Sequence, residues 1–431
     1  MRVPLFLQPD TRNSSRLHPE FVDLEGCSRF ATARFPAGCG RVPTGMTTEP
    51  MLAACARDRS PAMAVGPVEQ RWPDVNRIAV LRGGGLGDVL SAVPAMDALA
   101  AAYPKAEIVL LTPPGYRDLM IDRPSPVNHV VPLPPARGVY EPDERFGDAT
   151  SGDTFYDEMR SRPVDLGVQV HGGGRWSNPF LLSLRPRWTV GTRTPDAEPL
   201  TRWVPYRFYQ QEAMRWLEVV GLAGATPVTL EPRIAATDTD LARAQRALPW
   251  SEATFVVIHP GARDPRRRWP AENFASIVAT CVDEGLRAVV VGTPAEQSVM
   301  EDVAQRARAA VSAPAAEAVV VLAGLDLSSL CGVLARADLL IGNDSGVRHL
   351  ARAVGTPTVG IFWIGNAFTA GPLGRSRDRV LMSWTTRCPV CDRDCTRLDV
   401  PRCEHDVSFV ADVTPAEVMD EVSDLLHRLM P

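Results

Sequence analysis

Residues 337–362, ADLLIGNDSGVRHLARAVGTPTVGIF, place a polar turn and a short helical segment between two apolar runs. The runs ADLLIG and PTVGIF have the length and composition of buried strands. In the intervening VRHLARAV, apolar residues three and four apart predict one buried helix face, and Gly355 is expected to end the helix. The stretch therefore predicts a strand, a helix and a parallel strand, a unit in which ligands bind where the helix begins.

The polar turn, NDSG at residues 343–346, falls at the predicted start of this helix. The N–H groups of a helix start are unsatisfied and carry a partial positive charge, so they favour an anion such as phosphate. Gly346 would let a phosphate approach the backbone, and Ser345 and His349 share a helix face. Asp344 cannot bind a phosphate itself, and we expect it to order the turn or to accept hydrogen bonds from sugar or ribose hydroxyls. The alternative is that Asp344 only caps the helix.

The composition of the 431-residue chain is that of a globular protein, with 45% hydrophobic and 23% charged residues, and allows two or three domains. A net charge of -5 argues against nucleic acid as the main partner. No apolar run reaches about eighteen residues, and the N-terminus lacks the apolar core of a signal peptide, so we expect a cytoplasmic protein. Residues 1–75 show no sustained periodicity. They predict a disordered extension or, with Met46, Met51 and Met63 as alternative starts, a start-site artefact; the alternative is a regulatory tail.

The N-terminal half of the remaining chain begins with RIAVLRGGGLGDVLSAVPAMDALAAAYP, residues 77–104. This segment predicts a strand, a glycine-rich turn and one helix that ends before its last proline. Further strands are predicted at 106–112 and 165–170, the second followed by HGGG and a helix that Ser177 would cap. These elements predict an α/β domain at residues 76–230.

The C-terminal half repeats this plan after a seam near residues 222–250. Strands are predicted at 254–262, 287–292 and 318–324, and helices near 271–284, near 296–310 and from Asp326. With residues 337–362 these elements predict a second α/β domain at 231–413. A last helix is expected at 414–431, where Thr414 and Glu417 form a capping box and Pro415 takes the first helical position.

Three segments of the chain resemble the ordered signatures of the heptosyltransferase-like enzymes, glycosyltransferase family 9. They are GGGLGDVLSAVP at 83–94, HPGARDPRRRWPAENFA at 259–275 and GNDSGVRHLARAVGTPTVGIF at 342–362. The resemblance covers roughly residues 76–425. It implies a GT-B fold, with two Rossmann-like doubly wound domains facing a cleft, the acceptor in the first domain, the nucleotide-sugar in the second, and inversion at the anomeric carbon.

The family's best-known members transfer heptose from ADP-heptose to the lipopolysaccharide inner core. The resemblance therefore implies an ADP-heptose donor, a glycolipid or saccharide acceptor, and peripheral contact with the cytoplasmic face of the inner membrane. Two alternatives remain. One is the same fold and mechanism with another nucleotide-sugar or acceptor, and the other is a non-catalytic sugar or nucleotide binder.

The expected base of an inverting transfer is Asp88, at the mouth of the glycine turn and the start of a helix. The resemblance places the family's proposed base on the same residue. The alternative is a plain helix cap. Gly85, Gly87 and His171 are expected to contact the acceptor, although His171 could instead make a structural hydrogen bond. The GGGLGD turn lacks the regular spacing of a dinucleotide site, which disfavours an NAD enzyme.

The leaving nucleoside diphosphate needs fixed positive charge, which RDPRRRWP at 263–270 supplies. Where family members often carry a lysine two residues before Trp, this chain has Arg267, which keeps the charge but changes its geometry. We expect Arg267 to stabilise the leaving group, with Arg266 as the rival and a solvated face as the alternative. The remaining expected nucleotide contacts lie at strand ends and are His259, Gly261, Gly292 and Glu296, although Glu296 could instead begin a helix.

The sequence offers two kinds of candidate metal ligand, paired aspartates and clustered cysteines. Two Asp-x-Asp pairs, 238 with 240 and 392 with 394, are not expected at strand ends in the cleft, so we predict metal-independent transfer with no required cofactor. Capping explains the first pair. Four clustered cysteines, with His405 two residues beyond the last, predict either a structural zinc site, reduced thiols or a disulfide; they are Cys388, Cys391, Cys395 and Cys403.

Overall fold

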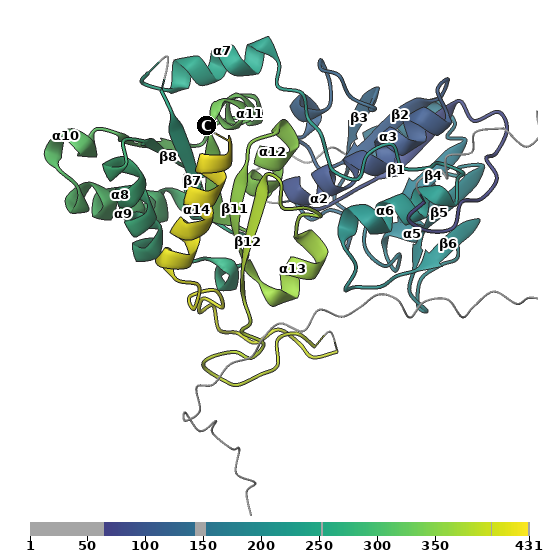
Figure 1. Ribbon diagram of the computed structural model, residues 1–431. Helices are drawn as coiled ribbons and strands as arrows, with labels where there is room; N and C mark the ends of the chain where they lie inside the picture. Colours follow the sequence, from purple (N-terminus) through teal and green to yellow (C-terminus); the bar gives the residue numbers. More distant parts are fainter. Residues whose placement is uncertain (1–63, 143–151, 251–252, 398, 430–431) are drawn as a thin grey trace, which may run out of the picture. The chain divides into compact units, whose positions relative to one another are not determined.

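The structure, a computed structural model, describes residues 64–142, 152–250, 253–397 and 399–429. The expectations for residues 1–63 lie outside this part of the chain. Two six-stranded parallel sheets form the framework, one in each half of the chain (Figure 1). No helix in the described ranges is both long enough and apolar enough to cross a bilayer.

The first sheet has the strand order β3-β2-β1-β4-β5-β6. Its strands are β1 (Arg77–Leu81), β2 (Glu107–Thr112), β3 (His129–Pro132), β4 (Leu166–Gln169), β5 (Trp188–Arg193) and β6 (Arg202–Pro205). Its helices are α2 (Leu86–Ser91), α3 (Val93–Ala102), α4 (Gly152–Ser161), α5 (Ser177–Ser183) and α6 (Glu212–Gly221). We call this half the N-terminal lobe.

The second sheet repeats the same topology, with the order β12-β11-β10-β7-β8-β9. Its strands are β7 (Phe255–His259), β8 (Arg287–Gly292), β9 (Val319–Ala323), β10 (Leu339–Asn343), β11 (Thr358–Trp363) and β12 (Asp378–Ser383). Its helices are α7 (Asp238–Ala247), α8 (Ala271–Asp283), α9 (Gln297–Ala310), α10 (Ala313–Ala316), α11 (Leu327–Arg336), α12 (Gly346–Val354), α13 (Ile364–Ala370) and α14 (Pro415–Leu429). We call this half the C-terminal lobe.

Both sheets are doubly wound Rossmann-like sheets, as the sequence predicts. The order reverses between β1 and β4 in the first sheet and between β7 and β10 in the second. These are the switch points where a parallel sheet opens a crevice at its carboxyl edge. All five residues of β1, β7 and β10 are buried, because helices cover both faces of each sheet.

The helix predicted after β1 is wrong in one respect, because it is two helices that meet at Ala92. Pro94 is one of the first residues of α3. A proline has no N–H to donate to the residue four positions earlier, and its ring clashes with that carbonyl, so the first helix stops.

Two other expectations also need correction. Ser177 does not cap α5: it is the first helical residue, and its hydroxyl donates to the carbonyl of His171 at 2.7 Å. Residues 64–75, assigned to the extension, pack on the N-terminal lobe. Val75 is buried in its core, and Trp72 stacks on Trp188 with ring centroids 5.6 Å apart.

The two lobes contact each other through several elements. Helix α2 packs against helix α12, as Figure 1 shows. Arg123, between β2 and β3, forms an ion pair with Asp240 of α7 at 2.9 Å. The domain boundary at residue 230 stays a prediction, but Ile234, just beyond it, already donates to the carbonyl of Ala353 in α12 at 2.8 Å.

Candidate active site where the two lobes meet

The glycine-rich turn after β1 wraps around the carboxylate of Asp88. The Oδ2 atom accepts the N–H of Gly85 at 2.6 Å, and Oδ1 pairs with Arg82 Nη2 at 2.9 Å. Gly84 has φ +92°, which favours glycine, and a side chain there would lie 2.4 Å from Asp88 Oδ2. Asp88 is the third residue of α2 and accepts the N–H of the N-cap residue Gly85, so it does help to cap the helix; its role as a base stays a prediction. Its side chain is nevertheless 44% exposed, so a capping carboxylate also remains open to a ligand.

Arg82, which the sequence analysis missed, holds the carboxylate of Asp88 in place through their ion pair. Its side chain is 3% exposed and lies over the ring of Trp216, 4.9 Å from the centroid. Its other partners are the carbonyl of Val170 at 2.7 Å and Glu212 Oε2 at 2.8 Å. The available signal was an arginine that directly follows the apolar run Ile78–Leu81, because such a charge can be buried only with partners.

His171 lies at the end of β4, next to the same turn. Its Nε2 is 3.1 Å from the carbonyl of Gly138, and a side chain on Gly83 would come within 2.9 Å of its ring. Burial and then the charge of Arg82 lower the pKa of His171 below its usual value. The ring is therefore neutral at pH 7 and forms part of the wall of the turn. Its contact with an acceptor stays a prediction.

In the C-terminal lobe, Asp344 follows β10 and is the centre of an ionic cluster. Its carboxylate is 3.1 Å from Arg267 Nη1, 3.4 Å from Arg348 Nη2 and 3.5 Å from His349 Nε2. Burial alone would raise the pKa of Asp344, but His349 and the charges of Arg348 and Arg267 outweigh burial and hold that pKa far below its usual range. Asp344 thus orders the turn, one of the two roles expected for it.

Arg348 is the second residue that the sequence analysis missed. It is fully buried on α12, donates to the carbonyl of Ala370 at 3.0 Å and lies 4.5 Å from the centroid of the Phe362 ring. Burial lowers the pKa of Arg348 to about 10, which still leaves it protonated at neutral pH. Burial and the charge of Arg348 lower the pKa of His349. With His349 neutral, two guanidinium groups and one carboxylate leave one net positive charge at this helix start.

Ser345, the N-cap of α12, connects this cluster to the neighbouring strand ends. Its Oγ is 3.0 Å from His259 Nδ1 at the end of β7. His259 Nε2 is 3.8 Å from Glu296 Oε2, which accepts the N–H and the hydroxyl of Thr293, each at 2.9 Å. Glu296 therefore also completes a capping box, so both of its expected roles are compatible with the structure.

Two glycines of the donor half make room for these groups. A side chain on Gly261 would lie 1.9 Å from Glu296 Oε1, and one on Gly292 would lie 2.7 Å from Met300 Sδ. Both glycines therefore have a packing role, whether or not a nucleotide also contacts them.

Arg266 and Arg267, the two candidates for stabilising the leaving group, have different partners. Arg266 donates to both oxygens of Asp264, with Nη2 2.6 Å from Oδ2. Burial opposes ionisation of Asp264, but its bonds with Arg266 lower its pKa to about 2. Arg266 is thus committed to a local ion pair. The geometry favours Arg267, because Arg267 contacts the Asp344 cluster.

The starts of α2 and α12 pack closely enough that neither Gly87 nor Gly346 has room for a side chain of its own. A side chain on Gly87 would lie 2.7 Å from His349 Cδ2, and one on Gly346 would lie 3.0 Å from Leu86 Cβ. Each glycine therefore admits a side chain of the opposite lobe. Neither contact was expected from the sequence, and the binding of acceptor by Gly87 and of phosphate by Gly346 stay predictions.

The two Asp-x-Asp pairs are used for other contacts. Asp240 accepts the N–H of Thr237 at 2.8 Å in a capping box and pairs with Arg123. Asp394 accepts the N–H of Thr396 at 3.0 Å. The capping interpretation of the first pair is confirmed. Among the described residues, the group with metal-ligand geometry is elsewhere and consists of Cys388, Cys391, Cys403 and His405.

Two doubly wound sheets, with an exposed carboxylate at the start of α2 and net positive charge at the start of α12, fit the GT-B fold. Residues 208–398 match the model of glycosyltransferase family 9 (heptosyltransferase). The matched segment covers less than half of the chain and makes it similar to the heptosyltransferases of this family.

Curated heptosyltransferases are similar to this chain along most of its length. Lipopolysaccharide heptosyltransferase 2 of Escherichia coli K12 is 24% identical over 381 residues, which cover 81% of this chain and 98% of that protein. Lipopolysaccharide heptosyltransferase 1 of Pseudomonas aeruginosa is 24% identical over 308 residues, covering 70% of this chain and 82% of that protein.

Solved structures share the fold. A family 9 glycosyltransferase from Veillonella parvula gives a TM-score of 0.64 at 18% identity, covering 85% of this chain and 99% of its own. The ADP-heptose lipopolysaccharide heptosyltransferase II of E. coli gives 0.61 at 19% identity, covering 82% and 99%.

Proposed function

We propose that this glycosyltransferase transfers heptose from ADP-heptose to a lipopolysaccharide-core-like acceptor, with inversion and without a catalytic metal. One observation carries the proposal. The start of α2, which holds Asp88, touches the start of α12, which holds the Asp344 cluster, through the contacts of Gly87 and Gly346. A base for the acceptor and positive charge for the leaving group therefore belong to one site.

On the donor side, the diphosphate would bind at the N-terminus of α12. The helix start and the net positive charge of Arg267, Arg348 and Asp344 would stabilise the negative charge that develops as the bond from the anomeric carbon to the diphosphate breaks. Arg267 is 23% exposed and so can turn its second guanidinium nitrogen toward a ligand. These groups would supply the charge that a divalent metal supplies in other glycosyltransferases.

On the acceptor side, Asp88 would accept the proton of the attacking hydroxyl. Gly85 and Arg82 each occupy one lone pair of its carboxylate and so fix its direction. The acceptor oxygen forms its bond to the anomeric carbon on the face opposite the departing diphosphate. A single displacement of this kind inverts the anomeric carbon.

The names of the two heptosyltransferase relatives support heptose and lipopolysaccharide as substrates. The proposal includes action in the cytoplasm at the inner membrane, where such an acceptor would be displayed. One observation favours a second candidate, transfer to a different acceptor. The family model matches residues 208–398, which leaves out most of the predicted acceptor domain at 76–230.

The experiment is calorimetric titration with ADP, UDP and GDP, followed by mass spectrometry of the products formed from ADP-heptose and a truncated lipopolysaccharide core. We expect ADP to bind tightest and the acceptor to gain one heptose. Tighter binding of UDP or GDP would overturn the heptose assignment. Binding of ADP with no transfer to the core, but transfer to another saccharide, would favour the second candidate.

Metal independence is tested separately with desalted enzyme. The initial rate should not change when magnesium or manganese is added, or when a chelator is present that leaves the folded protein intact by circular dichroism. A rate that requires either ion would refute the metal-independent mechanism.

A further inference from the structure

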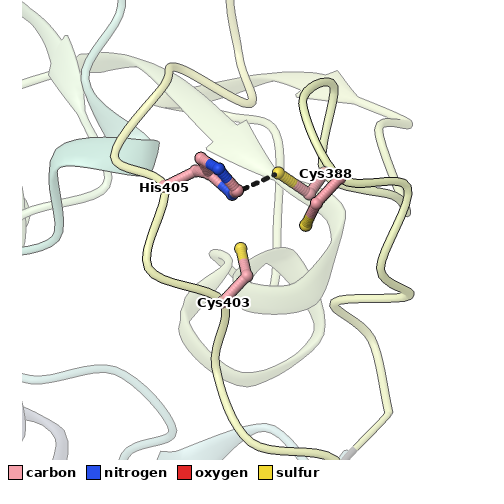
Figure 2. A group of neighbouring side chains, drawn as sticks. Cys388, Cys403 and His405 are labelled. Atoms are coloured by element: carbon pink, nitrogen blue, oxygen red, sulfur yellow. Dashed lines mark hydrogen bonds between the residues drawn. The ribbon is translucent and has the colours of Figure 1, made fainter.

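We infer that Cys388, Cys391, Cys403 and His405 form a structural Zn²⁺ site. Their sulfur and ring nitrogen atoms all lie within 4.8 Å of one another. Figure 2 shows Cys388, Cys403 and His405 pointing toward a common centre. Three thiolates and one imidazole are a ligand set typical of closed, tetrahedral zinc sites. This site is distinct from the cluster around Asp344.

The geometry of one pair is already that of a metal site. Cys388 Sγ and His405 Nδ1 are 3.7 Å apart. Two ligands on a tetrahedral zinc, with Zn–S of about 2.3 Å and Zn–N of about 2.05 Å, lie about 3.6 Å apart. The described cysteines of the cluster are free thiols rather than disulfides. Zinc binding needs little rearrangement of this pair.

The fourth ligand differs from the one expected from the sequence. Cys395 is not in the group, and its thiol donates instead to the carbonyl of Arg393 at 3.3 Å. His405 takes its place. The reason is the fold of the loop: an isolated bridge between Arg387 and Asp394 closes a short hairpin that carries Cys388 and Cys391, and Cys395 lies beyond this bridge.

The surrounding segment needs such a cross-link. Its described residues between β12 and α14, 384–397 and 399–414, contain no helix or strand. Irregular segments of this length are uncommon in compact domains. Cys388 and Cys403 are buried in the same core cluster as Phe409 and Val410. A metal that joins 388–391 to 403–405 would hold both ends of the segment on that core.

The same segment braces the arginine turn of the donor site. The N–H of Phe409 donates to the carbonyl of Arg266 at 2.7 Å, and the hydroxyl of Ser408 donates to the carbonyl of Arg268 at 2.6 Å. Arg402 Nη2 lies 3.4 Å from Asp264 Oδ1. Zinc bound at Cys403 and His405 therefore positions residues 264–268, and with them Arg267, without touching a substrate.

The first test is the metal content of the purified full-length protein by plasma mass spectrometry, after growth in medium that contains both zinc and iron. We expect about one zinc per chain. Cys391→Ser and His405→Gln, which change an exposed and a half-buried ligand, should lose it. The control Cys395→Ser should keep it.

Three results would overturn the site. They are wild-type protein without stoichiometric metal, iron in place of zinc, and zinc that is lost in Cys395→Ser but kept in His405→Gln. A disulfide between the cysteines, detected as a loss of two mass units per bond in the intact protein, would also exclude it.

Hydrogen exchange tests the bracing role without any substrate. In His405→Gln, or after zinc removal, exchange should accelerate at residues 403–409 and also at 264–268, while β1 and β2 stay unchanged. Acceleration confined to 385–405 would show that the metal does not position the arginine turn.

Discussion

The role of Asp88 can be tested by Asp88→Asn. Asp88 accepts one hydrogen bond on each oxygen, from Gly85 at 2.6 Å and from Arg82 at 2.9 Å. Asparagine keeps one acceptor, and its NH₂ group would face the other donor. Losing a hydrogen bond and exposing a partner costs about 1 to 3 kcal/mol, and the 44% exposed side chain puts the loss at the lower end, about 1 kcal/mol. The variant should therefore fold.

The effect on transfer should be much larger. Asparagine cannot accept the acceptor proton, and a positioned general base typically contributes about 10² to 10⁴ in rate. The assay measures turnover of ADP-heptose by mass spectrometry, with ADP affinity measured by calorimetry on the same sample. We expect turnover to fall by at least about a hundredfold and ADP affinity to change less than about twofold.

A matched control is Asp326→Asn. Asp326 also caps a helix, accepting the N–H of Ser329 at 2.7 Å, and also pairs with an arginine, Arg243, at 2.9 Å, but it serves α11. The Asp326→Asn variant should lose about as much stability as Asp88→Asn and keep wild-type turnover. Wild-type turnover in folded Asp88→Asn would refute the base, and an equal loss in Asp326→Asn would show that the assay reports only stability.

Three further predictions concern the C-terminal lobe. Arg267→Met should weaken ADP binding by at least about tenfold, since a charge-assisted hydrogen bond is worth about 1.5 to 3 kcal/mol. The control Arg263→Met changes an exposed neighbour and should leave ADP binding unchanged. Equal losses of affinity in calorimetry would mean that ADP responds to the general positive charge of the segment and not to Arg267 itself. Gly346→Val should also weaken ADP binding by about tenfold. Adding Leu86→Ala to this variant removes the side chain that the new valine would meet, and it should not restore ADP affinity. Restored affinity would mean that Gly346 serves only the contact between the lobes. Burial opposes ionisation of Glu296, but His259 and Thr293 hold its pKa at about 2 against an ordinary 4.5, so the unfolded chain takes up a proton first as the pH falls. The free energy of unfolding should then drop by about 1.4 kcal/mol from this group between pH 7 and pH 3.5, and urea titrations of Glu296→Gln should lack that share; an identical pH dependence would contradict the assignment.

Much of the fold follows from local patterns in the sequence. Apolar runs predict β1, β2 and β4 in the first sheet and every strand except β12 in the second. Turn and capping residues predict where helices begin, as at Asp326 and at Thr414 with Glu417. Pro94 even carries the signal for the break that we did not expect. These features are local because a strand or a cap depends on residues within a few positions of each other. The identities of Asp88, Asp344 and Arg267 as candidate site residues came from the same level, through three short motifs.

The tertiary structure alone decided which of these residues meet. Gly87 and His349 are 262 positions apart, and only the packing of α2 on α12 brings them into contact. The buried partners Arg82 and Arg348 had no motif, because burial of a charge depends on what surrounds it in space. The cluster of Cys388, Cys391, Cys403 and His405 shows the same limit. Sequence spacing gave four cysteines equal standing, and the bridged hairpin replaced Cys395 with His405, since ligation depends on distances between atoms and not on order along the chain.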